Sequence, residues 1–186
     1  MFKDFVTAYQ AEYVSTLENL DQESLTQLLN LVEEAIKNSR NVFVLGNGGS
    51  SASASHWVCD FNKGVSYEKR ELKARFFSLT DNVPVLTAYG NDVAYEEIFA
   101  EQLKNLLRKE DLVISLSVSG NSKNLVLGQK YAKEQGVTTV SITNNQNNLL
   151  KQTADLAIAV PSENYGIVED VHMYVCHVLS QYIAQK

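Results

Sequence analysis

The sequence predicts an α/β protein, a three-layer αβα sandwich whose five-stranded parallel sheet is preceded by two N-terminal helices. After residue 40, short apolar or β-branched runs alternate with segments of helical periodicity, which is the pattern of a parallel sheet with helices on both faces. Before Gly46 the chain has no Gly or Pro, and its apolar residues recur three and four positions apart, which favours helices. At 186 residues, the chain has the length of one domain.

Residues 1–40 predict two helices. The first is amphipathic, with an apolar face that begins Phe2, Phe5, Val6, Tyr9 and Tyr13. This face continues through Leu17 and Leu20, so the helix is a candidate for a contact between subunits, and packing onto its own domain is the alternative. Asp21 offers an N-cap for the second helix, whose apolar positions are Leu25, Leu28, Leu29, Val32 and Ile36.

The remaining residues predict the strands of the sheet and the helices that cover it. Strands are expected over residues 41–45, 75–79, 112–116, 138–142 and 156–160. Helical periodicity covers residues 95–107 and 124–134, and a last helix is expected from about 168 to 184. The charged stretch 67–75 predicts a solvated loop.

Composition excludes several classes of function. The chain is 45% apolar and 20% charged, so it has enough apolar residues for a folded core. Its net charge of −6 argues against direct, non-specific binding to nucleic acid, which depends on Lys and Arg. No apolar run is long enough to span a membrane and the first dozen residues lack an apolar signal core, so a cytoplasmic location is expected. Cys59 and Cys176 match no metal-binding spacing and are expected to be buried free thiols.

The first expected strand runs into a glycine-rich loop with the sequence Gly46-Asn47-Gly48-Gly49-Ser50-Ser51. Glycines let the main chain approach a ligand closely, and the helix start that follows offers free N–H groups to an anion. A dinucleotide-binding fingerprint fits poorly, because Ser51 stands at its sixth position and no acidic residue ends a second strand about 20 residues on. A Walker A loop is excluded because no Lys follows the glycines. No nucleotide cofactor is expected.

The third expected strand runs into a second loop rich in hydroxyl groups. Ser117, Ser119 and Ser122 surround Gly120 at another expected helix start. Hydroxyls and main-chain N–H groups together form a nest for a phosphate group without any positive side chain. Because the carboxyl ends of parallel strands share one edge of the sheet, both loops point to one site for a phosphorylated small molecule.

The two loops resemble those of the sugar-isomerase (SIS) domain family, and more narrowly its phosphoheptose isomerase branch. The resemblance extends to Gly90-Asn91-Asp92, to Tyr95–Phe99 and to the His-bearing last helix, so it covers residues 1–186 as a single SIS domain. Residues 1–40 would be N-terminal helices for oligomerisation, and residues 41–186 the sugar-phosphate-binding core.

The resemblance implies an aldose–ketose isomerase, an intramolecular oxidoreductase that converts sedoheptulose 7-phosphate to a heptose 7-phosphate through an enediol. It also implies a homotetramer with active sites at subunit interfaces. The alternative is a non-catalytic sugar-phosphate sensor or adaptor that resembles the SIS proteins binding a replication initiator.

The resemblance also implies a role for individual residues. Asp60 would be the catalytic base and His177 the complementary acid. One Zn²⁺ per site would be held by His56, Asp60, Glu169 and His177. The substrate would be bound by Asn47, Gly48, Gly49, Ser50, Asp92, Ser117, Ser119, Ser122 and Glu169.

Two of these residues depart from the family pattern, because Asp60 and Glu169 stand where the family has Glu and Gln. Asp is one methylene shorter than Glu, and catalysis needs reacting atoms about 3–3.5 Å apart. Two close carboxylates repel each other unless a proton or a cation lies between them, so Glu169 beside Asp60 would favour a divalent ion.

Helix geometry constrains the proposed metal ligands. His56 and Asp60 are four residues apart, and therefore neighbours on one helix face. Glu169 and His177 are separated by about 12 Å along a helix axis, so one straight helix does not bring both to one ion. Either the helix start bends or a neighbouring subunit supplies one ligand. His172 lies well around the helix from His177 and is expected to be packed or on the surface rather than to bind metal.

Overall fold

The computed structural model describes residues 1–186 and confirms the predicted αβα sandwich. Its five strands form one parallel sheet in the order β2-β1-β3-β4-β5. All five expected strands are present, with ends that differ by at most two residues from the predicted ones. The strands are β1 (Val42–Gly46), β2 (Phe76–Ser78), β3 (Leu112–Leu116), β4 (Thr138–Asn144) and β5 (Leu156–Val160).

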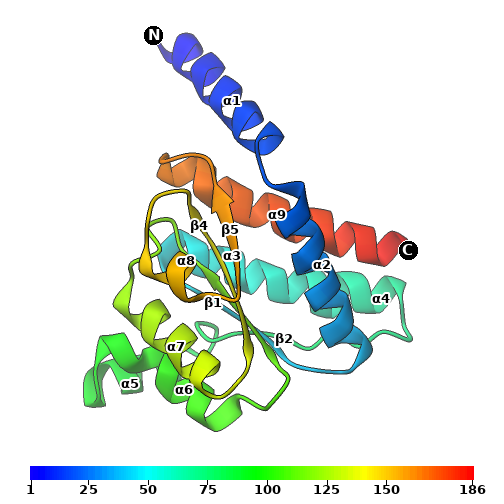
Figure 1. The fold of residues 1–186 in the computed structure, drawn as a ribbon, viewed down its shortest axis with the longest axis vertical. Helices are drawn as coiled ribbons and strands as arrows, with labels where there is room; N and C mark the ends of the chain where they lie inside the picture. The colour runs from blue at the N-terminus through cyan, green and yellow to red at the C-terminus, as the bar shows by residue number, and fades with distance from the viewer.

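Helices cover both faces of the sheet (Figure 1). On one face lie α2 (Gln22–Lys37), α3 (Gly48–Cys59) and α9 (Tyr165–Gln185). The other face is covered by α6 (Ile98–Leu106) and α7 (Lys123–Glu134). The shorter helical segments are a π-helix (Asp60–Val65), α4 (Ser66–Glu68), α5 (Val83–Asp92), a 3₁₀ turn (Tyr95–Glu97) and α8 (Leu149–Thr153). None of the helices is long and apolar enough to cross a membrane.

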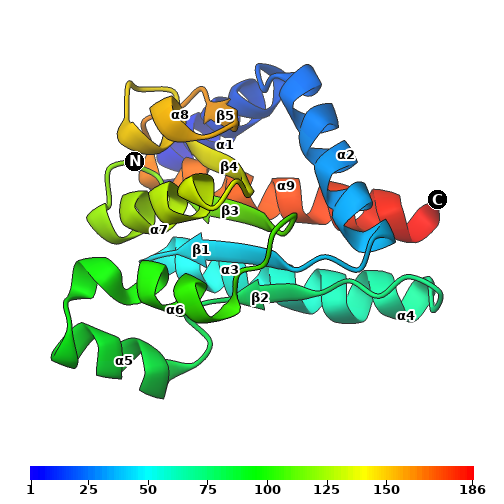
Figure 2. The ribbon, with the colours of Figure 1, turned by 60° about the horizontal axis from the view of Figure 1, so that its bottom comes forward.

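The larger part of the hydrophobic core lies between the sheet and α2, α3 and α9. Within it, the ring of Phe61 stacks on the rings of Trp57 and Phe76, with centroids 5.7 and 4.0 Å apart. These contacts fix the end of α3 and the π-helix against β2. Figure 2 shows α3, the π-helix and α4 following one another alongside α9, so side chains from α3 and α9 can meet.

The first helix, α1 (Phe2–Glu18), extends away from the body of the molecule (Figure 1). Its C-terminal half packs on the core through Tyr13 and Leu17. The other end leaves Phe2 80% and Phe5 64% exposed. Tyr9 ties the helix to α9 by donating a hydrogen bond of 2.7 Å to Asp170, which raises the pKa of Tyr9 to about 12. The predicted amphipathic helix is confirmed, and only part of its apolar face is buried on its own domain.

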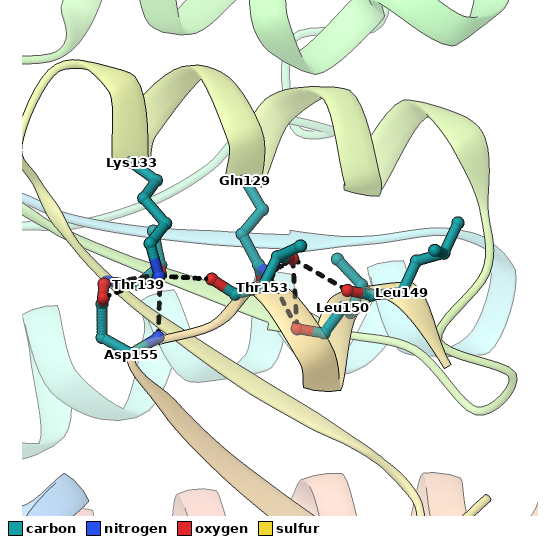
Figure 3. A network of polar contacts seen from close by, with 7 residues as sticks. All are labelled: Gln129, Lys133, Thr139, Leu149, Leu150, Thr153 and Asp155. Atoms are coloured by element: carbon teal, nitrogen blue, oxygen red, sulfur yellow. Dashed lines mark hydrogen bonds and ion pairs between the residues drawn. The ribbon is translucent and has the colours of Figure 1, made fainter. Parts of the chain in front are cut away.

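A polar network holds α8 and β5 against α7 (Figure 3). Gln129 donates to the carbonyl of Leu150 at 2.9 Å and to the hydroxyl of Thr153 at 2.7 Å. Lys133 forms an ion pair of 3.0 Å with Asp155, which also accepts hydrogen bonds from Thr139. Burial opposes ionisation of Asp155, but these partners outweigh it and hold the pKa of that carboxyl below its usual value.

The cap of α2 and the two cysteines were also predicted from the sequence. The Asp21 carboxylate accepts hydrogen bonds from the main-chain N–H groups of Glu23 and Ser24, which confirms the predicted N-cap of α2. Cys176 is buried as expected, but the prediction for Cys59 is wrong, because it is exposed. Helix α3 packs inward through Trp57, and a residue two positions later lies about 200° around the helix, on the solvent side.

Candidate functional site

The glycine-rich loop between β1 and α3 forms one wall of the site. Asn47 is the N-cap residue of α3, and Gly48 follows it with a φ of +53°, a conformation that favours glycine. A Cβ atom on Gly46 would collide with the main chain of Ser50, and one on Gly49 would collide with the carboxylate of Glu169. The glycines therefore allow two close approaches, one within the loop and one between the loop and α9.

The serine-rich loop between β3 and α7 forms the opposite wall. Ser117 begins this loop by donating its main-chain N–H to the carbonyl of Ile142 in β4 at 3.1 Å. The Ser117 hydroxyl accepts the N–H of Gly120, whose φ of +65° lets the chain turn beside Asn148. Ser122 is the N-cap residue of α7, and its hydroxyl accepts no main-chain N–H. The N–H of Leu125 is taken by the Asn124 side chain at 2.9 Å, and the other N–H groups of the first turn of α7 are open to an anion.

A small cavity of about 160 Å³ lies between the two loops. The side chains of Asn47 and Asn124 join the loops by two hydrogen bonds of 2.8 and 3.0 Å. The cavity has no Lys or Arg in its lining, so any phosphate held there is bound by hydroxyls and main-chain N–H groups. It is lined by Asn47, Ser50, Leu116, Ser117, Val118, Ser119, Ser122, Leu125, Tyr165 and Glu169.

The structure brings most of the predicted substrate-binding residues together. Asn47, Ser50 and Glu169 line the cavity with the three serines of the second loop, whereas Gly48 and Gly49 shape the first loop without lining the cavity. Asp92 is exposed at the C-terminal end of α5 and is not part of the lining.

Three residues at this site were missed by the sequence analysis. Tyr165 lines the cavity, Asn124 bonds Asn47, and the Tyr95 hydroxyl donates to the Asn47 side chain at 3.4 Å. Two of them carried a signal: Asn124 follows the serine-rich loop directly at a helix start, and Tyr95 begins one of the segments that resemble the family.

A cluster of two imidazoles and one carboxylate lies between α3 and α9. The Nε2 atoms of His56 and His177 are 3.1 Å apart. Asp60 places Oδ1 3.3 Å from the His56 Nε2 and Oδ2 3.7 Å from the His177 Nε2. Asp60 Oδ2 also accepts hydrogen bonds from the Ser180 hydroxyl at 3.4 Å and, more weakly, from the Cys176 thiol at 3.8 Å. Burial raises the pKa of that thiol, so Cys176 stays protonated.

This His–Asp–His cluster fits a divalent metal ion. Donors held tetrahedrally about 2.0–2.2 Å from one Zn²⁺ lie about 3.3–3.5 Å from one another. The two Nε2 atoms are 3.1 Å apart, and one donor atom from each of the three residues lies within 4.8 Å of the other two, so the cluster is compact enough to surround one ion. Two imidazoles and a carboxylate are also an ordinary ligand set for zinc. The three side chains are 43%, 24% and 44% exposed, so an ion and a substrate have access.

Glu169 is not part of this cluster. It lies on α9, which is a single helix from Tyr165 to Gln185, more than two turns before His177. Its carboxylate faces Gly49 and the cavity instead. The sequence spacing allowed either a bent start of the last helix or a ligand from a neighbouring subunit. A bent helix start is not observed, and one chain brings together three of the four expected metal ligands.

His172 is fully buried, so it is packed rather than on the surface. Its Nε2 lies 3.1 Å from the carbonyl oxygen of Ile142. Burial lowers the pKa of His172 to about 4, so the ring is neutral at physiological pH.

Comparison with known proteins places this arrangement in a family. The model of the SIS domain matches residues 7–144. A phosphoheptose isomerase from Helicobacter pylori strain P12 is 35% identical over 95% of this chain and 90% of its own length. A probable phosphoheptose isomerase from Thermoplasma acidophilum is 34% identical, with coverage of 90% and 91%.

The same likeness is found among solved structures. A phosphoheptose isomerase from Neisseria gonorrhoeae is 25% identical and superposes with a TM-score of 0.90, with all of both chains covered. The likeness to the Neisseria structure thus covers the whole chain, including α1 and α2. The chain belongs to the SIS domain family and, within it, to the phosphoheptose isomerases.

Proposed function

We propose that this protein is an aldose–ketose isomerase that converts sedoheptulose 7-phosphate to a heptose 7-phosphate. The observation that carries the proposal is the presence, in one chain, of a polar cavity suited to phosphate and a His–Asp–His cluster suited to proton transfer. The relatives named phosphoheptose isomerase support the same substrate. A cytoplasmic location agrees with a phosphorylated metabolite as substrate.

Phosphate recognition would occur at the cavity between the two loops. The helix starts at Gly48 and Lys123 direct main-chain N–H groups toward one edge of the sheet, where their partial positive charge favours an anion. The hydroxyls of Ser117, Ser119 and Ser122 add hydrogen-bond donors. The Glu169 carboxylate would repel a phosphate group but can accept hydrogen bonds from sugar hydroxyls. It therefore favours the orientation of the substrate in which the sugar, and not the phosphate, lies toward α9.

Isomerisation would proceed by proton transfer through an enediol. The Asp60 carboxylate removes the proton from the carbon beside the carbonyl, and the electron pair of that C–H bond forms the C=C bond of the enediol. The carbonyl oxygen takes a proton from His177. Asp60 then returns a proton to the former carbonyl carbon, while the hydroxyl on the adjacent enediol carbon gives its proton back to His177 and becomes the C=O of the aldose. The Ser180 hydroxyl donates a hydrogen bond to the Asp60 carboxylate, whose two oxygens face the two imidazoles.

A Zn²⁺ ion would be held by His56, Asp60 and His177. When bound, it supplies Lewis-acid polarisation of the sugar oxygens. Because the Glu169 of the same chain faces Gly49, a Glu169 ligand to that ion would have to come from a second copy of the chain.

We further propose that the protein is a homotetramer. The exposed apolar end of α1, with Phe2 and Phe5, requires cover, and a second copy provides it. An assembly that brings a Glu169 of one copy to the cluster of another would complete the expected ligand set.

An isomerase assay with sedoheptulose 7-phosphate tests the proposed function. The wild type should form heptose 7-phosphate, and Asp60→Asn and His177→Gln should each lower kcat by at least 100-fold, the usual effect of losing a general acid or base. Glu134→Gln, which changes an exposed carboxylate on α7, is the control and should keep full activity. Tight binding of the sugar phosphate without turnover would instead favour a sensor or adaptor.

A further inference from the structure

The buried side chain of His172 connects the two halves of the proposed site. Its Nε2 lies 3.1 Å from the carbonyl oxygen of Ile142 in β4. The same carbonyl accepts the main-chain N–H of Ser117, also at 3.1 Å, at the first residue of the serine loop. A carbonyl oxygen has two lone pairs, so it serves both donors. Ile142 is therefore a shared acceptor between α9 and the phosphate-binding loop.

A second hydrogen bond extends this connection to α3. The indole Nε1–H of Trp57 donates to the main-chain carbonyl of His172 at 3.1 Å. Trp57 follows His56 directly, and His172 lies between Glu169 and His177 on α9. The path from Trp57 through His172 and Ile142 to Ser117 thus joins the His–Asp–His cluster to the serine loop through buried groups.

The protonation of His172 follows from its surroundings. A carbonyl oxygen can only accept a hydrogen bond, so the Nε2 that faces it carries the proton and, in the neutral ring, Nδ1 does not. Nδ1 is buried and has no partner. A leucine would fill a buried position without leaving a polar atom unsatisfied, so the imidazole costs stability unless its Nε2–H contributes something that an apolar side chain does not.

We propose that His172 is a positioning residue that holds the serine loop at a fixed place relative to α9. The proposal rests on the function proposed above, because it treats the serine loop as the phosphate-binding element. A sugar phosphate would span from this loop to the His–Asp–His cluster, so an error of about 1 Å in the loop displaces the reacting carbons and costs up to about 100-fold in rate.

Two substitutions of His172 distinguish the effect of its hydrogen bond from the effect of its packing. His172→Leu removes the donor and keeps a buried side chain of similar size, whereas His172→Gln keeps an N–H group near the Nε2 position. Val175→Ala, at another buried position of α9, is the control for a loss of stability without a loss of hydrogen bonding. Should His172→Leu fail to fold, Trp57→Phe removes the other hydrogen bond of the path and takes its place.

The first measurement is amide hydrogen exchange of the serine loop, which does not depend on any activity. We expect His172→Leu to speed exchange at Ser117 and Gly120 at least 10-fold, with His172→Gln and Val175→Ala close to wild type. Unchanged exchange in His172→Leu, or equal acceleration in Val175→Ala, would overturn the proposal.

The second measurement is calorimetric binding of inorganic phosphate, followed by isomerase kinetics. His172→Leu should weaken phosphate binding and raise KM about 5- to 10-fold, and His172→Gln should restore both to within about twofold. Equal affinities for wild type and His172→Leu would contradict the proposal. A wild type that binds no phosphate but shows the expected exchange changes would refute the phosphate site and leave the positioning role of His172 intact.

Discussion

Ser119 and Ser122 illustrate how single hydroxyls create the proposed binding site. Both line the cavity, and the Ser122 hydroxyl accepts no main-chain N–H of the helix that it precedes. Each is therefore able to donate to a phosphate oxygen without breaking a helix cap. The Ser119 hydroxyl also accepts the N–H of Asn121 at 3.4 Å, and the loop main chain is held in addition by the Ser117 hydroxyl and by the N–H of Leu150, which donates to the carbonyl of Gly120 at 3.0 Å.

Replacing both hydroxyls should weaken sugar-phosphate binding without unfolding the protein. A hydrogen bond to a charged group contributes about 1.5–3 kcal/mol, so Ser119→Ala with Ser122→Ala should lower the affinity at least 10-fold in calorimetry. Ser15→Ala on exposed α1 is the control. An unchanged affinity in the double variant would contradict the assignment of this loop.

His172 also predicts how stability depends on pH. Its pKa is about 4 in the folded protein and 6.5 in a model peptide, so between these values the unfolded chain binds more protons than the folded one. Stability should therefore fall as the pH drops from about 6.5 to about 4, by up to about 3 kcal/mol from this residue alone.

Urea unfolding of wild type and His172→Leu at pH 7 and pH 4.5 measures this effect. The variant should lose less of its free energy of unfolding than the wild type does over the same pH range. Parallel losses in the two proteins would show that His172 does not titrate as its burial requires.

Among the elements, strands and long helices were predictable and short irregular helices were not. Buried strands such as β3 and β5 leave near-continuous apolar runs, and α2 has both a periodic face and an Asp cap. The π-helix that begins at Asp60 has no such signal in the sequence, and the ring of Phe61 within it stacks on Trp57 and Phe76, which are contacts that residue periodicity does not reveal. Helix α8 is too short for periodicity and is held by hydrogen bonds from α7 (Figure 3).

Contacts within one chain bury only part of the apolar face of helix α1, so they do not explain the role of this helix. Its N-terminal half exposes Phe2 and Phe5, and its link to α9 depends on Tyr9 and Asp170. Deletion of residues 1–18 should therefore yield a smaller assembly that unfolds at a lower temperature, because contacts between copies are lost.

Light scattering and thermal unfolding test that role. Tyr9→Phe is a useful comparison, since it removes the hydrogen bond to Asp170 but keeps the apolar face of α1 and should keep the assembly. A truncated protein that still forms a tetramer would contradict the proposed contact.

At the scale of the whole molecule, the parallel sheet explains why the two loops were predictable as one site. Both follow strands whose carboxyl ends share an edge, and β1 and β3 are neighbours in the sheet. The same reasoning could not place Glu169, because its position depends on how α9 packs against Gly49. Nor did the sequence predict that His172 joins α9 to the serine loop, since that requires the approach of α9 to the end of β4.

The whole arrangement has one central consequence: a substrate held by its phosphate at the loops would present its carbonyl end to Asp60 and His177. Asp60 and His177 are within 3.7 Å of each other and partly exposed, so protons that they carry exchange with water. An enediol route therefore predicts that a solvent-derived hydrogen enters the product at carbon.

The most direct test is isomerisation of sedoheptulose 7-phosphate in D₂O, followed by NMR of the product. We expect deuterium at the carbon that receives the returned proton, and at least 100-fold slower turnover and deuterium incorporation with Asp60→Asn. A heptose 7-phosphate formed at full rate by the wild type with no deuterium at that carbon would contradict proton transfer through groups that exchange with water, and with it the account.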